Sequence, residues 1–167
     1  VSRRIVVPGG PKPDTAVFVN AVGRYVRIQL TQEDWLTLAE VKVFGTAGPL
    51  GSNVAAGKAA TQSSELYDCL ASRAVDGDTT GIWAGDSLSC TTNEVNAWWQ
   101  VDLGALHQID VVEVWNRTDG SQARLQDFYV FVSDIPFSDT DPAEIVGQNG
   151  VQSRRMITRG GPRPSVA

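Results

Sequence analysis

The sequence predicts an all-β domain, either a β-sandwich or a closed barrel. Short runs of strand-forming residues recur along the chain, and no helical period is sustained for long. The 16 glycines and 8 prolines fall mostly between these runs. Many short strands at fairly regular spacing, separated by turn residues, are typical of sandwiches and barrels.

Five segments are expected to form strands. In YVRIQL (25–30) apolar residues alternate with Arg27 and Gln29, which is the period of a strand with one buried face. QEDWLTLAEV (32–41) is expected to hold at most one turn of helix, and GALHQ, which contains His107, is expected to be a loop. The remaining strands are expected at VKVF (41–44), WWQVDL (98–103), IDVVEVW (109–115) and FYVFVSD (128–134).

The paired tryptophans Trp98 and Trp99 begin one of these strands. Neighbouring residues of a strand face opposite sides of the sheet. One indole is therefore expected in the core, and the other on the outer face.

Length and charge narrow the class of protein. A chain of 167 residues is long enough for one domain with a real core. Its net charge of −5 argues against binding to nucleic acid and against insertion into an anionic membrane, because both kinds of partner favour a basic protein face. No apolar run approaches the roughly 20 residues of a membrane helix. Trp83 is the only aromatic candidate for a membrane-inserting loop tip.

A few residues indicate whether the chain is an enzyme and whether it is secreted. One histidine, His107, leaves little room for a histidine-based triad or a zinc site, and no nucleophile–base pair stands out. The chain is therefore expected not to be an enzyme. The two cysteines, Cys69 and Cys90, are compatible with one disulfide in a secreted protein, and equally with two unrelated thiols.

The two ends of the chain repeat each other. SRR at 2–4 recurs at 153–155, and GGP at 9–11 recurs at 160–162, both after 151 residues. Equal spacing at two places indicates a repeat after one domain length. The chain therefore looks cut from a tandem array, out of phase with its domain.

This repeat predicts a circularly permuted organisation. Residues 1–45 form the C-terminal part of a unit, 46–52 a linker, and 53–167 the N-terminal and middle part. The two parts either close into one domain within the chain or complete a neighbouring molecule by swapping. Closure within the chain is favoured, because domain termini usually lie close together. Only one copy of the repeat can fill the native position, so the other is expected to fray or to pair at an edge.

A family resemblance becomes visible when 53–150 is read before 1–45. In that order the chain contains NVAAGKAATQSS, ASRAVDGDTTGIW, NAWWQVDLG, NRTDGSQARL, GRYVRIQL and LTLAEVKVFG. Together these segments resemble the F-type (fucose-binding) lectin family, within the discoidin or coagulation-factor type C superfamily. The resemblance implies a jelly-roll β-sandwich whose loops at one end bind glycans, and a non-catalytic, secreted module.

A calcium site is implied around AVDGD. Asp76 and Asp78 lie two apart in a glycine-containing turn, and hard cations take oxygen ligands of this kind. The resemblance implies a structural calcium that clamps the two parts of the permuted domain together. A solvated acidic turn is the alternative. By position the ligands would be the Arg73 carbonyl, Asp76, Asp78, Ser87, the Ala39 carbonyl and Glu40.

The sugar site is expected in NRTDGSQAR (116–124). An arginine, an aspartate two residues later and a second basic residue match the family's signature, here Arg117, Asp119 and Arg124. Guanidinium groups offer fixed planar donors to sugar oxygens, and a nearby acid holds such a group in place. A hairpin turn with a solvated ion pair is the local alternative.

Two departures from the family pattern affect this site. The position of the family histidine falls at or next to Cys90, so Thr91, Thr92 or Asn93 is expected to replace its hydrogen bond. Gly120 and Ser121 stand where many relatives have adjacent cysteines. A Cys69–Cys90 bond that ties two ligand-side loops together is one alternative, and two unpaired thiols are the other. Specificity is therefore fucose-type or drifted, and the alternative is a structural or protein-interaction spacer with a degenerate site. The glycosylation acceptor pattern at 116–118 is taken as incidental.

Overall fold

The computed structural model describes residues 3–5, 14–45 and 52–157, with the backbone alone at 3–5. The strands are β1 (Arg3–Ile5), β2 (Asp14–Leu30), β3 (Thr37–Gly45), β4 (Ala59–Gln62), β5 (Ser89–Cys90), β6 (Trp98–Asn116), β7 (Phe128–Ser133) and β8 (Val151–Met156). The helical elements are short: η1 (Ala71–Val75), η2 (Trp83–Gly85), η3 (Gln122–Arg124) and α1 (Pro142–Gly147). The predicted all-β class is confirmed.

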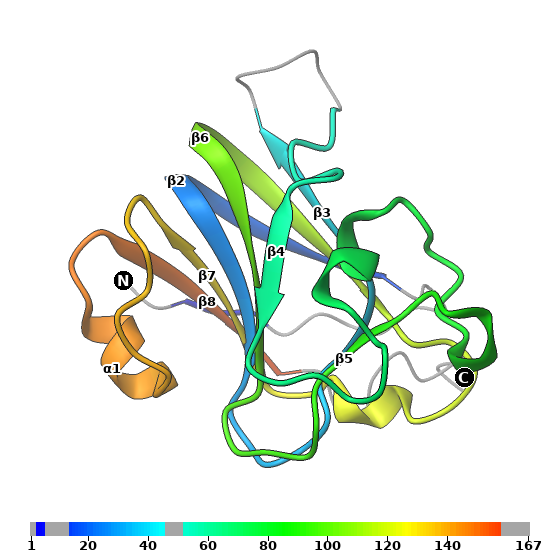
Figure 1. Ribbon diagram of the computed structural model, residues 1–167. Helices are drawn as coiled ribbons and strands as arrows, with labels where there is room; N and C mark the ends of the chain where they lie inside the picture. The colour runs from blue at the N-terminus through cyan, green and yellow to red at the C-terminus, as the bar shows by residue number, and fades with distance from the viewer. Residues whose placement is uncertain (1–2, 6–13, 46–51, 158–167) are drawn as a thin grey trace, which may run out of the picture.

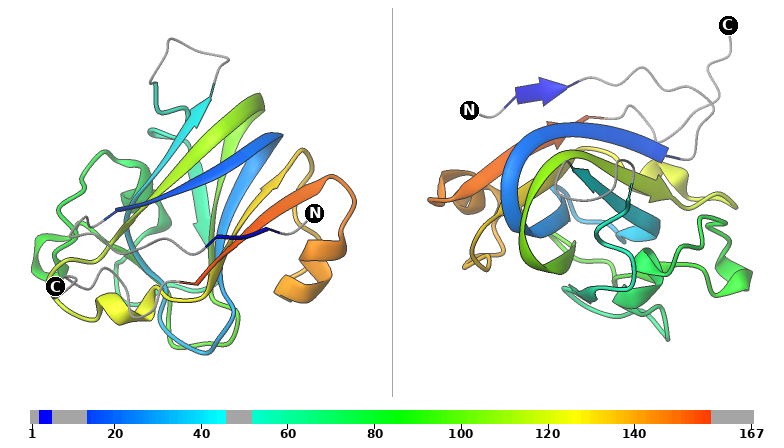
Figure 2. Two further views of the ribbon diagram at one scale, coloured as in Figure 1. Left: turned by 180° about the vertical axis from the view of Figure 1, so that it is seen from behind. Right: turned by 90° about the horizontal axis from the view of Figure 1, so that it is seen from above.

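Two long bent strands build the sandwich. The hydrogen-bonded order is β1-β8-β7-β2-β6-β3-β5, with β4 also paired to β6. β2 pairs with β6 along most of its length, with register shifts between Phe18 and Ala21 and between Gly23 and Tyr25. Figure 2, right, shows both strands curling over, so that their two ends contribute to opposite layers. A Cβ on Gly23 would collide with the Val132 side chain, so this bend needs a glycine.

The core lies between these layers. Trp99 is fully buried while Trp98 is partly exposed, as the strand period predicts. The other fully buried large side chains include Ile28, Leu30, Leu36, Leu38, Leu103, Ile109, Phe128 and Phe131. β2 and β3 come from residues 14–45 and pair with β6 from residues 98–116, so one core joins the two segments. That this order is a permutation of a tandem unit stays a prediction.

The repeated ends meet at an edge of the sheet. β8 pairs antiparallel with β7, and β1 adds to β8 in parallel. Arg3 faces Arg154, Arg4 faces Arg155 and Ile5 faces Met156, so each residue of β1 pairs with its counterpart in the repeat. The C-terminal copy thus occupies the inner position, and the N-terminal copy pairs at the edge.

Two local predictions are wrong. Residues 31–36 form bends and an isolated bridge rather than a helical turn, and β3 begins at Thr37. The run from Leu36 to Val41 is buried throughout, so its apolar pattern carries no period. The expected GALHQ loop is part of β6, which continues from Trp98 to Asn116. Its bend passes through Gly104, whose φ is +83°.

Candidate functional site

Backbone hydrogen bonds join some of the five loop segments 31–36, 63–70, 80–87, 91–96 and 116–124. The Thr118 amide donates to the Gly81 carbonyl (2.8 Å), and the Leu66 amide to the Cys90 carbonyl (3.0 Å). Asp34 and Glu94 form a β-bridge. Most of these segments gather at the lower right of Figure 1. The predicted sugar-binding signature lies in the last of them.

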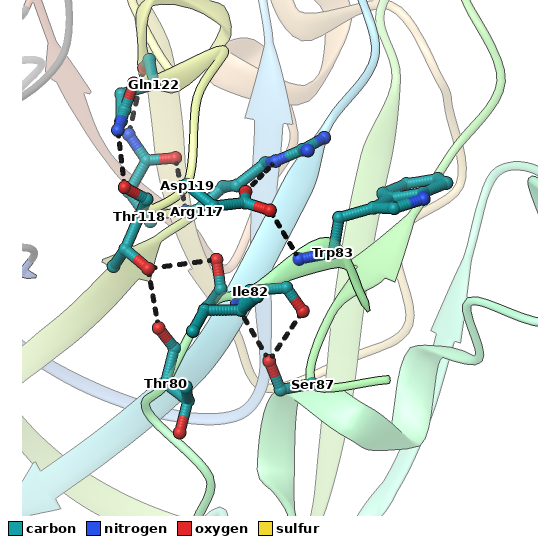
Figure 3. A network of polar contacts seen from close by, with 10 residues as sticks. Thr80, Ile82, Trp83, Ser87, Arg117, Thr118, Asp119 and Gln122 are labelled. Atoms are coloured by element: carbon teal, nitrogen blue, oxygen red, sulfur yellow. Dashed lines mark hydrogen bonds and ion pairs between the residues drawn. The ribbon is translucent and has the colours of Figure 1, made fainter. Parts of the chain in front are cut away.

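Arg117 is fixed by an acid and an aromatic ring. Its Nε donates to Asp119 Oδ1 at 2.5 Å, and its guanidinium lies 5.0 Å from the ring centroid of Trp83. Asp119 Oδ2 accepts from the Trp83 amide at 2.9 Å (Figure 3). The hydrogen bond from Arg117 lowers the pKa of Asp119. These contacts hold the guanidinium in one orientation and keep the carboxylate charged.

Arg124 repeats the arrangement with different partners. Its Nε lies 3.7 Å from Asp34 Oδ1, and its guanidinium lies 4.4 Å from the centroid of Trp35. The Arg124 side chain is 29 % exposed and that of Arg117 14 %. Both arginines of the signature therefore combine an acid, an aromatic ring and access to solvent.

Side-chain hydrogen bonds hold the turn between the two arginines. Thr118 donates its hydroxyl to the Thr80 carbonyl (2.7 Å), and Gln122 donates its amide to the Thr118 carbonyl (2.8 Å), as Figure 3 shows. Asn116 is 1 % exposed, and its amide nitrogen donates to the Gln122 carbonyl (2.9 Å). That amide is committed to holding the turn, which agrees with an incidental glycosylation pattern.

The residues near the missing histidine are mostly buried. Cys90 and Thr91 are 0 % and 1 % exposed. The Thr91 hydroxyl accepts from the Leu36 amide (2.9 Å) and donates to the Thr92 carbonyl (2.9 Å), so it organises the backbone. Thr92 is partly exposed, with its hydroxyl 2.9 Å from that of Ser64.

An exposed apolar rim borders Arg117. Tyr67 is 77 % exposed and meets Trp83 edge-on, with centroids 6.2 Å apart. Leu70 and Ile82 are 46 % and 40 % exposed. Sequence reasoning named Trp83 only as a possible loop-tip residue and missed Tyr67, Asp34 and Trp35. No local pattern could have revealed their roles, because Asp34 and Trp35 meet Arg124, and Tyr67 meets Trp83, only through the folded loops.

The predicted calcium ligands cluster around Glu40. Glu40 is fully buried; its Oε2 accepts from the Gly77 amide (3.2 Å), whereas Oε1 has no partner among the described residues. Burial, together with the neighbouring charge of Asp76, raises the pKa of Glu40 to about 7. A buried oxygen without a partner is a position where a cation would be favourable.

The other predicted calcium ligands differ in how far their oxygens already accept or donate hydrogen bonds. Asp76 and Asp78 accept from the amides two residues ahead of each, at 2.8 Å. The Ser87 hydroxyl is already bonded to the backbone of Ile82. Arg73 lies in η1 and the buried Ala39 in β3, where their carbonyls are the relevant atoms. Within 14–45 and 52–157 no three His, Cys, Asp or Glu side chains could hold a metal together, so carbonyl ligands would be needed.

The fold is that of a discoidin-like β-sandwich. The sequence model of the NedA-like, galactose-binding domain family matches residues 73–159, more than half of the chain, and the chain belongs to this family. A segment of 46 residues is 44 % identical to fucolectin-1 of Anguilla japonica. This segment is 28 % of the chain and 26 % of fucolectin-1, so about a quarter of that lectin is spanned. No solved structure matches.

Within the described residues no helix is long and apolar enough to cross a membrane.

Proposed function

We propose that this chain is a non-catalytic carbohydrate-binding module, of fucose type or with drifted specificity, whose ligand contacts Arg117, Asp119 and Arg124. The observation that carries this proposal is that both arginines are held between an acid and a tryptophan on adjoining loops. Fixed guanidinium donors beside aromatic surface suit a sugar, which presents hydroxyls and one apolar face. The family description and the name of the partial relative both point to sugar ligands.

The contacts leave specific donors for a ligand. Asp119 engages Nε of Arg117, and no described residue accepts a hydrogen bond from its Nη1 or Nη2. Among the described residues, the Arg124 side chain has one polar partner, Asp34 at 3.7 Å. We propose that Tyr67 and Trp83 supply the apolar surface that adjacent cysteines provide in many F-type lectins. We propose that Thr92 or Asn93 replaces the family histidine, because Cys90 and Thr91 are buried whereas Thr92 is partly exposed and Asn93 exposed.

Calorimetry and glycan arrays test this function. The wild-type protein with calcium is titrated with L-fucose, with galactose and with oligosaccharides that carry them. Arg117→Ala and Arg124→Ala are expected to lower affinity at least about tenfold, the loss of roughly 1.4 kcal/mol of binding free energy. Arg155→Ala is the matched control, because Arg155 also has an acid and an aromatic partner but lies on a strand.

The same experiment addresses the spacer alternative. That alternative is motivated by the lost histidine and the lost cysteine pair. A folded protein that binds no glycan, or whose glycan binding survives both loop-arginine variants, would contradict the sugar site at Arg117 and Arg124.

We also propose a structural calcium held by Glu40, Asp76 and Asp78 with the Arg73 and Ala39 carbonyls and the Ser87 hydroxyl. The partnerless oxygen of Glu40 supports it. Calcium would neutralise the buried carboxylate and join β3 to the loop after η1. Calcium titration followed by the melting temperature tests it, with Glu40→Gln as the variant that should lose the response.

The organisation and location are proposals as well. We propose that the chain is drawn from tandem lectin units of a secreted protein and closes within one chain. Residues 1–45 are the C-terminal part of a unit, 46–52 the linker, and 53–167 the N-terminal and middle part. The same strands could be exchanged between molecules. Light scattering separates these outcomes, since a swapped assembly would be a dimer.

A further inference from the structure

The two cysteines lie on backbone segments that are hydrogen-bonded to each other. The Cys90 amide donates to the Cys69 carbonyl at 3.2 Å. The Gln62 side chain donates to both carbonyls, at 2.9 Å to Cys69 and 3.0 Å to Cys90. A direct backbone hydrogen bond keeps the two Cα atoms within reach of the roughly 4.4–6.8 Å that a disulfide spans.

The side chains of these cysteines share one small apolar cluster. Cys69 and Cys90 pack with Ala39 and Leu88, bordered by Leu66, Trp83 and Trp115. Both are free thiols and both are buried, Cys69 at 7 % exposure and Cys90 at 0 %. Burial, followed by a hydrogen bond with the Cys69 side chain, raises the pKa of Cys90.

We infer that Cys69 and Cys90 form a disulfide on exposure to a disulfide oxidant such as oxidised glutathione. The more accessible Cys69 thiolate attacks one sulfur of glutathione disulfide and releases one glutathione. The Cys90 thiolate then displaces the second glutathione from Cys69. Two protein thiols are oxidised, one glutathione disulfide is reduced to two thiols, and no other reactant is needed.

This bond would fix the loop that carries Tyr67. Tyr67 has a φ of +54°, a left-handed conformation that a non-glycine residue keeps only when its surroundings hold it. Its ring meets Trp83, whose amide is bonded to Asp119. A cross-link two residues away would therefore hold Tyr67 beside Arg117. This consequence rests on the proposed sugar site, whereas the disulfide itself does not.

Peptide mapping tests the bond directly. The native protein is equilibrated with oxidised glutathione, remaining thiols are alkylated, and trypsin is applied without reductant. Trypsin cleaves after Lys58, Arg73 and Arg117, which places the two cysteines on separate peptides, 59–73 and 74–117. We expect a linked pair of these peptides, an intact mass lower by about two hydrogen atoms, and a melting temperature raised by several degrees.

Controls keep the result interpretable. Cys69→Ser and Cys90→Ser must each abolish the linked pair. Two alkylated cysteines, or a stable glutathione adduct without the linked pair, would overturn the inference. The effect on the site is read separately: oxidation should tighten glycan binding several-fold, and Tyr67→Ala should abolish that difference. A linked pair in a protein that binds no glycan would leave the disulfide in place and remove the sugar function.

Discussion

Arg27 and Arg117 are built from similar parts but face different surroundings. The Arg27 guanidinium lies between two rings, 4.5 Å from the Trp98 centroid and 4.4 Å from that of Phe137. Its nitrogens donate to Gln100 Oε1 (3.1 and 2.9 Å) and to the Asp139 carbonyl (2.8 Å). It is 3 % exposed, and burial lowers its pKa to about 10.

Arg117 has one ring and one partner. Trp83 covers one face of the guanidinium, and Asp119 binds a single nitrogen. The comparison shows that an arginine packed on aromatic rings does not define a ligand site. A guanidinium covered on both faces and hydrogen-bonded through three nitrogens belongs to the core. A guanidinium that is covered on a single face, and that has nitrogens without a hydrogen-bond acceptor, is available to a ligand.

Replacing Arg27 should have the largest effect on stability. Arg27→Leu removes a buried guanidinium and leaves the partly buried Gln100 and the Asp139 carbonyl without their donor. We expect the free energy of unfolding to fall by about 3 kcal/mol. Urea denaturation measures this loss. A fall below about 1 kcal/mol would mean that the Phe137 loop repacks and that the enclosure is not structural.

Glu40 provides the opposite case, a buried charge with incomplete partners. Its folded pKa of about 7 lies above its ordinary value of 4.5, because burial and the charge of Asp76 outweigh the hydrogen bond from the Gly77 amide and the attraction of Lys42. The folded protein therefore binds the proton more tightly than the unfolded chain. With a calcium chelator present, the stability supplied by this protonation should be full near pH 4 and lost as the pH rises through 7, by about 2–3 kcal/mol.

The measurement is unfolding free energy against pH, with Glu40→Gln as the matched variant. Glutamine keeps the shape of the side chain and cannot ionise, so the decline should flatten. Added calcium should reverse the wild-type decline above pH 7, where the carboxylate is charged. An equal decline in the variant would assign the pH effect to other groups.

Exchanging arginine for lysine separates the two kinds of arginine. Arg117→Lys keeps the charge but loses the planar donors, so glycan affinity should fall about tenfold, roughly 1.4 kcal/mol. The free energy of unfolding should change by less than about 1 kcal/mol, because the ion pair with Asp119 is partly solvated. Arg27→Lys should do the reverse, lowering stability while the folded protein keeps its affinity. Parallel calorimetry and urea curves on both variants would show whether they differ.

The sequence predicted most of the strands because their alternation is local. YVRIQL, VKVF and FYVFVS lie within β2, β3 and β7, and Trp99 is buried as expected. The 32–41 segment was misread because its apolar residues run without a period. The GALHQ segment was misread because Gly104 allows a strand to bend without ending.

The candidate site could be predicted only in part. Arg117, Asp119 and Arg124 form a local pattern, and Asp119 does bind Arg117. The partners of Arg124 come from residues 34 and 35, about ninety positions away, in a loop that the Asp34–Glu94 bridge joins to 91–96. Tyr67 lies on another loop, and its own backbone is in the left-handed conformation. Such contacts depend on the packing of loops, for which a single sequence carries no periodic signal.

Arg155 should give the smallest effect, although its ion pair has good geometry. Its Nε donates to Asp127 Oδ1 and its Nη2 to Asp127 Oδ2, each at 2.7 Å. The guanidinium lies 5.6 Å from the ring centroid of Tyr129. The side chains of Arg155 and Asp127 are 39 % and 27 % exposed, so water solvates the separated charges well. Arg155→Ala should therefore lower the free energy of unfolding by less than about 1 kcal/mol. Salt at about 0.5 M should remove most of this difference, because charges are already screened over about 10 Å at roughly 0.1 M salt. Urea curves at low and high salt measure this. Glycan affinity should be unchanged, because Arg155 lies on the strand β8 and not on the loops; a loss of affinity in Arg155→Ala would mean that the binding surface extends onto the sheet face.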